Sequence, residues 1–351
     1  MTATIAAGLV CAVPFTEPDR VQLGHGSGGR MSATLITEVF IRALDNPALA
    51  AMGDGALVGV GGEAVVVSTD SFVVSPLEFP GGDIGSLAVH GTLNDVAMMG
   101  ARPVCLTAGF VLEEVLPMET LERIVRSMAR AARDAGVPIV AGDTKVVERG
   151  KADGLYVTTT GVGVADARFR PGPSLAEEGD VVIVSGDIGR HGMAILAARE
   201  GLSFETTITS DSACVVPLVD LLKAAEADVH VLRDPTRGGV ASALNEIAAA
   251  SNVGITLDED ALPIGENVRA ACEMLGLGPL YVANEGVMLA IVPEDEAELA
   301  LEAMRAHPLG VNAVVIGRVT ADSRGTVALR TALGGLRVVD VLPGDQLPRI
   351  C

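Results

Sequence analysis

Several aspartates of the chain stand beside turns or at the ends of expected elements, where acidic side chains can converge. Asp70 ends an expected strand, Asp83 follows a Pro-Gly-Gly turn, and Asp143 and Asp234 lie in the segments AGDTK and RDPTRGG. Mg²⁺ prefers oxygen ligands and shares them with substrate phosphates, so carboxylates without His or Cys partners indicate a Mg-nucleotide site. Taken singly, each aspartate fits better as an N-cap or turn residue, because Asp is favoured at both.

Asp95 differs from these aspartates because its position predicts burial. In the expected helix over 83–99, it shares one narrow arc with apolar or small residues, namely Ile84, Leu87, Ala88, Gly91 and Met98. A carboxylate facing the core must be paired, protonated or bound to a cation. We expect a functional role, with a salt bridge or a capping role as the alternative.

A glycine-rich segment, GHGSGG over 24–29, matches the letters of the dinucleotide fingerprint GxGxxG and precedes a helical pattern from Arg30. The fingerprint is excluded by its context, because no full strand precedes it and no acid-ended strand follows at the required spacing. The N–H groups of Gly28 and Gly29 at a helix start can still cradle phosphate. A simple turn explains the glycines equally well. The chain has no GxxxxGK[ST] segment.

Three further residues carry reactive groups. Lys145, two residues after Asp143, is a cation that could meet a phosphate or a developing anion, or could form an ordinary ion pair. Glu285 in ANEG precedes an apolar strand, and its residue type alone favours a solvated turn glutamate. Cys351 ends an eleven-residue segment rich in Pro and Gly that could extend about 35 Å. A thiol on such an arm is a carrier, unless it is an accidental last residue.

Composition excludes several classes of partner. The 351 residues hold 45 Asp plus Glu against 25 Lys plus Arg, and the net charge of −20 repels nucleic acid and anionic membranes. No apolar run is long enough to span a bilayer. The five cysteines include no CxxC pair, so neither a disulfide framework nor a zinc site is expected. No signal peptide is recognisable, and we expect a cytoplasmic protein.

The apolar patterns predict an α+β protein with two domains and mostly antiparallel sheets. We expect strands over 63–70, 103–112, 137–147, 155–164, 181–185, 286–292, 313–319 and 326–329, and helices over 83–99, 118–135, 210–227, 238–250 and 294–306. A segment rich in Pro and Gly near Pro171 marks the domain junction. The expected divisions are an extension over 1–20, domains over 21–170 and 171–340, and a flexible tail over 341–351 outside the regular elements.

Six blocks occur in order along the chain: HGSGG, PGGDIGSLAVHGTLNDVAMMGARP, AGDTKVV, RDPTRGGVASALNE, ANEG and the terminal PRIC. Together they resemble the HypE family of hydrogenase maturation factors, which are carbamoyl dehydratases within the ATP-binding PurM-like (AIR synthase-related) superfamily. The resemblance extends from His25 to Cys351, and the PRIC ending distinguishes this branch from its superfamily relatives. It implies a two-domain PurM-like fold, a homodimer paired through its N-terminal domains, and the use of ATP and Mg²⁺.

The resemblance also implies a reaction. The protein HypF loads a carbamoyl group onto the sulfur of Cys351, ATP-dependent dehydration gives a thiocyanate, and the cyano group passes to iron on a HypC–HypD complex for [NiFe]-hydrogenase. Lys145 is expected to stabilise charge, and Glu285 to act as base, which replaces its interpretation as a solvated turn residue. Residues expected to hold metal and nucleotide are Asp70, Asp83, Asp95, Asp143 and Asp234, with Gly28, Gly29, Asn94 and Thr144 at the nucleotide.

Two alternatives remain open at this point. The first is a PurM-like kinase or synthetase that acts on a free small molecule and needs no terminal thiol. The second is a non-enzymatic scaffold that only carries the cyano group.

Overall fold

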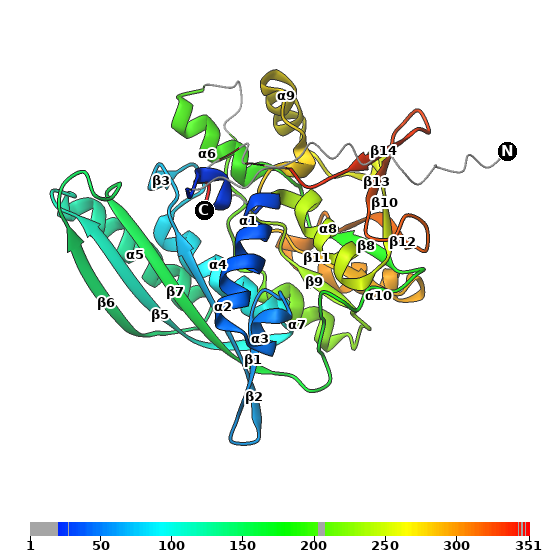
Figure 1. The fold of residues 1–351 in the computed structure, drawn as a ribbon, viewed down its shortest axis with the longest axis horizontal. Coiled ribbons are helices and arrows are strands. Elements are labelled where there is room, and N and C mark those ends of the chain that lie inside the picture. Colours follow the sequence, from blue (N-terminus) through cyan, green and yellow to red (C-terminus); the bar gives the residue numbers. More distant parts are fainter. Residues whose placement is uncertain (1–19, 27, 203–207, 343, 345–346, 348) are drawn as a thin grey trace.

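The computed structural model describes residues 20–26, 28–202, 208–342, 344, 347 and 349–351. Its N-terminal half is built on a five-stranded sheet in the order β1-β2-β7-β5-β6, in which only β5 and β6 run parallel. The strands are β1 (Ala56–Val60), β2 (Glu63–Phe72), β5 (Ala101–Glu113), β6 (Ile139–Val147) and β7 (Leu155–Ala165). Strand β6 forms one outer edge of this sheet (Figure 1).

Helices α4 (Ile84–Met98) and α5 (Met118–Asp134) belong to the same half, and α4 lies directly on the sheet. Twelve of the fifteen residues of α4 are buried. The expectation of a single apolar stripe is therefore wrong, because α4 has the N-terminal sheet on one side and the C-terminal half on another. Ala97 and Met98, for example, pack in the same cluster as residues of α7 and β8. A helix enclosed in this way is apolar nearly all round.

The C-terminal half is built on a seven-stranded sheet in the order β14-β13-β10-β12-β8-β11-β9, with β10 and β13 as its parallel pair. Helix α8 packs on one face, and α7 and α10 pack on the other. The strands are β8 (Val181–Val184), β9 (Val231–Arg233), β10 (Gly254–Asp258), β11 (Leu289–Val292), β12 (Val314–Thr320), β13 (Val327–Arg330) and β14 (Leu336–Val339). The helices are α7 (Val216–Ala224), α8 (Gly239–Ser251) and α10 (Ala297–Arg305).

Shorter elements complete the chain. A helical segment runs from α1 (Arg30–Leu35) through a π-helical turn, η2 (Ile36–Ile41), to α2 (Arg42–Leu44), and the short helix α3 (Pro47–Ala50) follows it. The C-terminal half also contains α6 (Arg190–Glu200) and α9 (Glu266–Leu275). Strands β3 (Glu78–Phe79) and β4 (Gly82–Asp83) form a small hairpin before α4. The single-turn 3-10 helices are η1 (Leu23–Gly26), η3 (Glu259–Ala261), η4 (Pro279–Tyr281), η5 (Glu294–Glu296) and η6 (Pro308–Gly310). Within the described ranges, the longest apolar helices still fall short of the length and hydropathy needed to cross a bilayer.

The α+β class with mixed, mostly antiparallel sheets is confirmed. The helix expected over 210–227 is wrong in its first part, because α7 begins at Val216 and residues 210–215 form a loop. That loop is held by tertiary hydrogen bonds that periodicity does not record: the N–H of Ser210 bonds to the carbonyl of Pro80, and Asn94 binds Ala213 and Val215. Strand β2 also continues to Phe72, so Asp70 lies within a strand rather than at its end.

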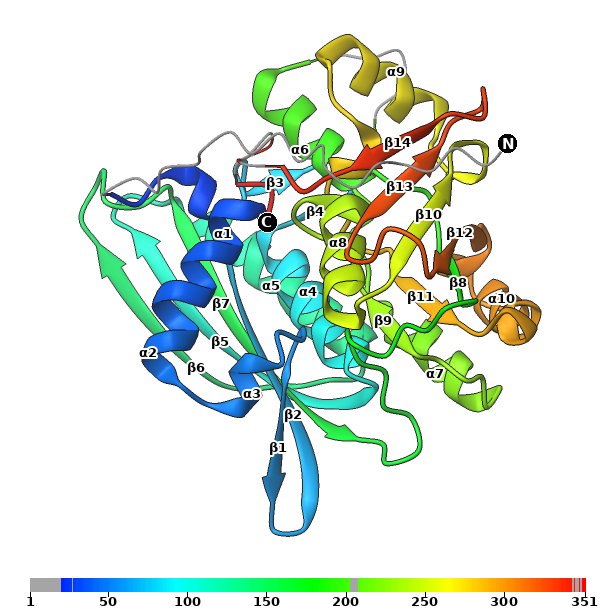
Figure 2. The same ribbon diagram turned by 45° about the vertical axis from the view of Figure 1, so that its right-hand side comes forward.

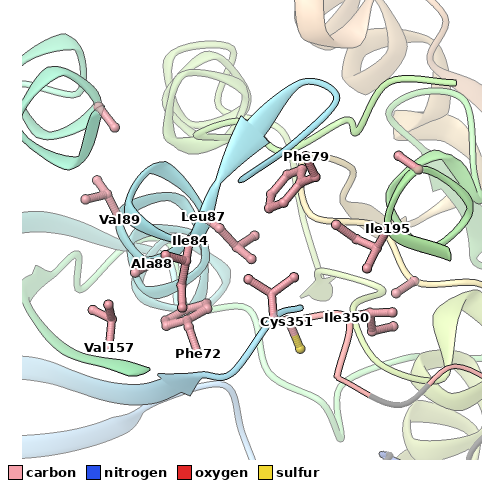
Figure 3. Packing of buried hydrophobic residues seen from close by; sticks show 14 of the residues in the cluster. Phe72, Phe79, Ile84, Leu87, Ala88, Val89, Val157, Ile195, Ile350 and Cys351 are labelled. Atoms are coloured by element: carbon pink, nitrogen blue, oxygen red, sulfur yellow. The ribbon is translucent and has the colours of Figure 1, made fainter. Parts of the chain in front are cut away.

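The end of the chain lies inside the molecule, between the two halves (Figure 2). No helix or strand forms in the described part of 341–351, as expected, but Ile350 and Cys351 are buried. They enter the N-terminal core between Phe72 and Leu87 on one side and Phe79 and Ile195 on the other (Figure 3). The structure therefore shows the terminal cysteine docked, and a carrier role requires its release.

Candidate active site

Three aspartates from separate parts of the chain meet where the two halves of the molecule join. Asp54 precedes β1, Asp95 lies near the end of α4, and Asp234 follows β9. One carboxylate oxygen from each lies within 4.8 Å of the others. Arg233 binds one side of this cluster, with Nη1 2.8 Å from Oδ1 of Asp54. The Oδ2 atom of Asp234 is buried and finds no hydrogen-bond partner among the residues that the structure describes.

The hydroxyl of Ser68 shows which protonation state this arrangement favours. Its Oγ lies 2.8 Å from the carbonyl oxygen of Asp54 and 2.7 Å from Oδ2 of Asp95. A hydroxyl has one hydrogen, so it can donate to only one of these two oxygens. Both contacts become hydrogen bonds when Asp95 carries a proton and donates it to Ser68. Without a cation, the geometry therefore favours a neutral Asp95.

The pKa values of the three carboxyls agree with that assignment. Burial raises the pKa of Asp54 to about 6 and that of Asp234 to about 7. Burial, together with the charges of Asp234, Asp54 and Asp70, raises the pKa of Asp95 well above its ordinary value. Three close carboxylates, one with an orphaned oxygen, fit a hard divalent cation, which would remove the cost of ionising them.

Asp70 and Arg237 extend the site beyond the three aspartates. Asp70 points from β2 toward the face covered by α4, and burial raises its pKa while the charge of Arg237 lowers it. The pKa of Arg237 is raised, first by the negative charge of Cys351 and then by those of Asp70, Glu285 and Asp95. Arg237 thus lies among the acids and the end of the chain.

The glycine loop packs against this arginine. Nη1 of Arg237 donates to the carbonyl of Gly26 at 3.1 Å. Gly28 has a φ of 74°, and a Cβ built on it would lie 2.9 Å from the Cβ and the carbonyl oxygen of Arg237. Only glycine fits this approach. Gly29 precedes the first turn of α1, so both glycines expected at a nucleotide lie beside the acidic site.

Glu285 is buried, with 3% of its surface exposed, and within the described part of the chain its Oε1 has no hydrogen-bond partner. Burial, then the charges of Asp234, Asp70 and Asp211, raise its pKa well above the ordinary value. Asp211 holds the Glu285 backbone, since its Oδ2 accepts the N–H groups of Glu285 and Gly286, each at 2.9 Å. A fixed, desolvated carboxyl of this kind is suited to exchange protons with a bound group.

Asn94 is buried next to Asp95 but is engaged by the protein. Its Nδ2 donates to the carbonyl of Ala213 at 3.0 Å and faces that of Glu285 at 3.5 Å. Its Oδ1 accepts the N–H of Val215 at 2.8 Å. In this structure Asn94 therefore positions the loop before α7 and the Glu285 segment, and its expected contact with a nucleotide stays a prediction.

The structure places four of the expected site residues away from the acidic cluster. Asp83 caps α4, with Oδ1 accepting the N–H groups of Gly85 and Ser86, and twelve residues of helix place it about 18 Å from Asp95. Asp143, Thr144 and Lys145 lie on β6, three strands from β2, a separation of about 14 Å. One cluster of all five predicted aspartates is therefore not formed within a single chain.

Lys145 also lies on the opposite face of the sheet from α4, which places it further from Cys351. Pairing places Asp143 in one row with Gly109, Thr158 and Ser71, and that row faces away from α4. Lys145, two residues on, points to the same face and forms an exposed ion pair with Asp143. Within one chain, Lys145 cannot reach the buried thiol.

Sequence reasoning missed several residues of this site. Asp54 lies in a Gly-Asp-Gly turn, a signal no stronger than that of many surface turns. Arg237 lies in the same RDPTRGG segment as Asp234, but its residue type and spacing alone do not predict a site residue. Asp211 was placed in a helix, where its role as a backbone acceptor could not be seen.

Two family profiles match the chain. Residues 52–165 match the N-terminal domain of AIR synthase related proteins, and residues 177–330 match the C-terminal domain. A carbamoyl dehydratase HypE from Cupriavidus necator is 56% identical over 333 residues, which is 95% of this chain and 95% of that protein.

Two solved structures have a similar fold. A crystal structure of a HypE–HypF complex has a TM-score of 0.83 and 49% identity, covering 88% of this chain and 99% of its own. A HypE crystal structure in complex with ATP has a TM-score of 0.80 and 49% identity, covering 95% of this chain and 100% of its own.

Proposed function

The chain belongs to the HypE family of carbamoyl dehydratases, and we propose that it dehydrates a carbamoyl group carried on its own Cys351 to a thiocyanate. The observation that carries the proposal is the docked chain end. The terminal cysteine is buried, and its negative charge raises the pKa of Arg237, as do the charges of Asp70 and Glu285. A solubilising surface tail would not be buried there. The product supplies the cyanide ligand of the iron in [NiFe]-hydrogenase.

The atom balance shows what the site must do. The C=O bond and both N–H bonds of the thiocarboxamide are lost, and the nitrile forms. Oxide is a poor leaving group from an amide carbon, and ATP when bound would supply the phosphoryl group with which that oxygen departs as phosphate. Glu285 would accept an amide proton, and Arg237 would stabilise negative charge that develops on the oxygen.

Mg²⁺ fits the carboxylates of Asp54, Asp95 and Asp234, with Asp70 close by. It would neutralise charge where phosphate must approach an otherwise repulsive cluster. The glycine loop at the start of α1 could offer backbone N–H groups to a phosphate, although the N–H of Gly28 donates to Oγ of Ser32 at 2.9 Å in this structure. Asp83 and Asp143 lie too far from this cluster to share its metal within one chain. They could bind a metal only at a second site, or at the cluster of a second copy of the chain.

The homodimer is supported by one face and one edge of the five-stranded sheet. That face carries the exposed hydroxyl pairs Thr69–Thr160 and Ser71–Thr158, and among the described strands β6 pairs only with β5. A hollow of about 330 Å³ lies between β6 and α5, lined by apolar residues. A second copy on this face is also the means by which Lys145 could enter an active site.

HypF is the proposed source of the carbamoyl group, because a relative 49% identical to this chain was solved in complex with it. A HypC–HypD complex is the proposed cyanide acceptor, a role that rests on the family alone. In both exchanges the thiol must leave its buried position, so the docked state described here belongs to the dehydration step.

Intact mass spectrometry tests the function. The chain carbamoylated by HypF should lose the mass of one water from its C-terminal peptide when ATP is added, with release of one ADP. Deletion of Cys351 should abolish the product while ATP binding persists. Thiocyanate formed by the deleted chain would contradict the proposal, and would favour a kinase or synthetase acting on a free molecule. A carbamoylated chain that neither loses water nor releases ADP when ATP is added would favour the carrier scaffold.

A further inference from the structure

Three buried carboxyl oxygens face no hydrogen-bond donor in the described part of the chain. They are Oδ1 of Asp211, Oδ2 of Asp234 and Oε1 of Glu285. A buried acceptor left without a donor costs about 1–3 kcal/mol, so such an oxygen in a native protein indicates a missing group. Asp234 belongs to the aspartate cluster, where a cation would satisfy it. The oxygens of Asp211 and Glu285 remain, and each needs a donor from a bound molecule.

Asp211 is fixed through its other oxygen. Its Oδ2 accepts the N–H groups of Glu285 and Gly286, each at 2.9 Å. The N–H of Ala213 donates to the carbonyl of Glu285 at 3.2 Å, so the two segments bond in both directions. A Cβ built on Gly286 would collide with the backbone carbonyl of Asp211, which shows how closely the segments pack. These contacts hold Asp211 in one position through Oδ2, and they leave Oδ1 for a ligand.

The carboxyl of Glu285 lies near the end of the chain. A Cβ built on Gly91 of α4 would lie 3.8 Å from Oε2 of Glu285 and 3.0 Å from the ring of Phe72. The residue after Phe72, Val73, donates its N–H to the carbonyl of Cys351 at 3.0 Å. Phe72 and Cys351 also belong to one core cluster, and Figure 3 shows both side chains in it. A group carried on Cys351 in this position therefore lies in the same part of the core as the Glu285 carboxyl.

A carbamoyl group on Cys351 has two N–H bonds, and dehydration breaks both. The electron pair of the first N–H forms the C=N bond as the carbamoyl oxygen takes a phosphoryl group from ATP. The electron pair of the second forms the C≡N bond as the C–O pair leaves with phosphate. One proton is released, and the other ends on the departing phosphate. A single carboxyl would have to discharge the first proton before it accepts the second, and Glu285 is only 3% exposed. Two acceptors remove this requirement.

We propose that Asp211 is a second catalytic residue of this reaction: its Oδ1 accepts one N–H of the carbamoyl nitrogen, and Oε1 of Glu285 accepts the other. Each carboxylate then takes the proton of the bond that faces it. A primary amide nitrogen supplies two donors to the two oxygens that lack them, which explains why the fold buries both without a partner. The inference rests on the proposed function and deepens it, because it assigns the acceptor of the second proton.

Single-turnover measurements on the chain carbamoylated by HypF test the assignment. Asp211→Asn keeps one oxygen for the two backbone N–H groups but replaces Oδ1 by an NH₂ group, which cannot accept. After rapid mixing with ATP, thiocyanate should form about tenfold more slowly than in the parent chain, while the Kd for ATP stays within about twofold. Asp211→Ala should be slower still, and Asp220→Ala, an exposed aspartate, is the control. An Asp211→Asn chain as fast as the parent would overturn the proposal.

Chemical rescue separates proton acceptance from positioning. Asp211→Ala leaves a space where a small carboxylate can bind, and formate should raise the rate of thiocyanate formation saturably, by about tenfold. Formamide has nearly the same shape and also offers an oxygen to the backbone N–H groups, but it is too weak a base to take the proton. Equal rescue by formamide would make Asp211 a positioning residue alone, and absence of rescue by formate would also overturn the assignment.

Failure of the inference and failure of the function are distinguishable in these assays. Thiocyanate that forms at one rate in the parent chain and in Asp211→Asn refutes the inference and leaves the function. A carbamoylated parent chain that forms no thiocyanate with ATP refutes the function, and the inference with it.

Discussion

Asp211 accepts the backbone N–H of Glu285 at 2.9 Å, while Oε1 of the Glu285 carboxyl is buried and has no hydrogen-bond partner among the described residues. The first acid thus fixes the position of the second without neutralising it. Asp211→Ala should lower kcat by about 10- to 100-fold, because a small displacement of a proton-transfer group is costly. The KM for ATP should change little.

Asp211→Asn keeps an acceptor oxygen and should recover part of the lost rate. Asp220→Ala, an exposed aspartate on α7, is the matched control in the same steady-state assay. Equal kcat values for Asp211→Ala and the control would remove Asp211 from the site.

Glu285→Gln should abolish most turnover, by about 100-fold or more, while the fold is kept. A base must be ionised, and burial raises the pKa of Glu285, so the rising limb of the pH–kcat profile should lie above the range of an ordinary glutamate. The same shift makes ionisation costly in the folded state. Thermal melts should therefore show Glu285→Gln gaining stability relative to the parent chain as pH rises. A flat pH–kcat profile in the parent chain would contradict the assignment.

In the absence of metal, the aspartate cluster predicts that the free energy of unfolding falls as pH rises. Asp54 and Asp234 have folded pKa values of about 6 and about 7, above the unfolded value of 3.8. Their contribution to stability is complete below about pH 4 and is lost as pH rises through 6 and 7, by roughly 3–4 kcal/mol for each group.

Mg²⁺ should therefore raise Tm more at pH 8 than at pH 6. Asp234→Asn should reduce both the pH dependence and the Mg²⁺ shift, whereas Asp260→Asn, an exposed aspartate, should change neither. Differential scanning calorimetry at the two pH values measures all of these shifts. A Mg²⁺ effect that survives in Asp234→Asn would place the metal elsewhere.

Subunit mixing can decide from which copy Lys145 acts. Glu285→Ala and Lys145→Ala homodimers should each be inactive. If each active site combines Glu285 of one copy with Lys145 of the other, random mixing should restore about a quarter of the parent activity, since half of the dimers then contain one intact site.

Mixing Glu285→Ala with Asp234→Asn should restore nothing, because both residues lie in the same chain's site. Light scattering before and after mixing checks that dimers are present and have exchanged. Activity recovered in neither mixture would assign no role to Lys145 across the interface.

The sequence predicted the fold class and most elements, because their apolar periods are strong and local. It failed where tertiary contacts decide: residues 210–215 are a loop because their backbone bonds to Pro80 and Asn94. Asp95 was recognised because a carboxylate interrupts an apolar helix. The role of Asp54 could not be predicted, because a Gly-Asp-Gly turn on the surface has the same sequence as one that contributes to a buried acidic cluster. The domain boundaries and the cytoplasmic location stay predictions.

The buried position of Cys351 has a practical consequence for anyone handling the protein. Cys351 is buried and its oxygen accepts the N–H of Val73, so a purification tag or fusion partner added after it should displace this docked end. Such an extension would hold the cysteine outside and leave a folded, nucleotide-binding but inactive enzyme.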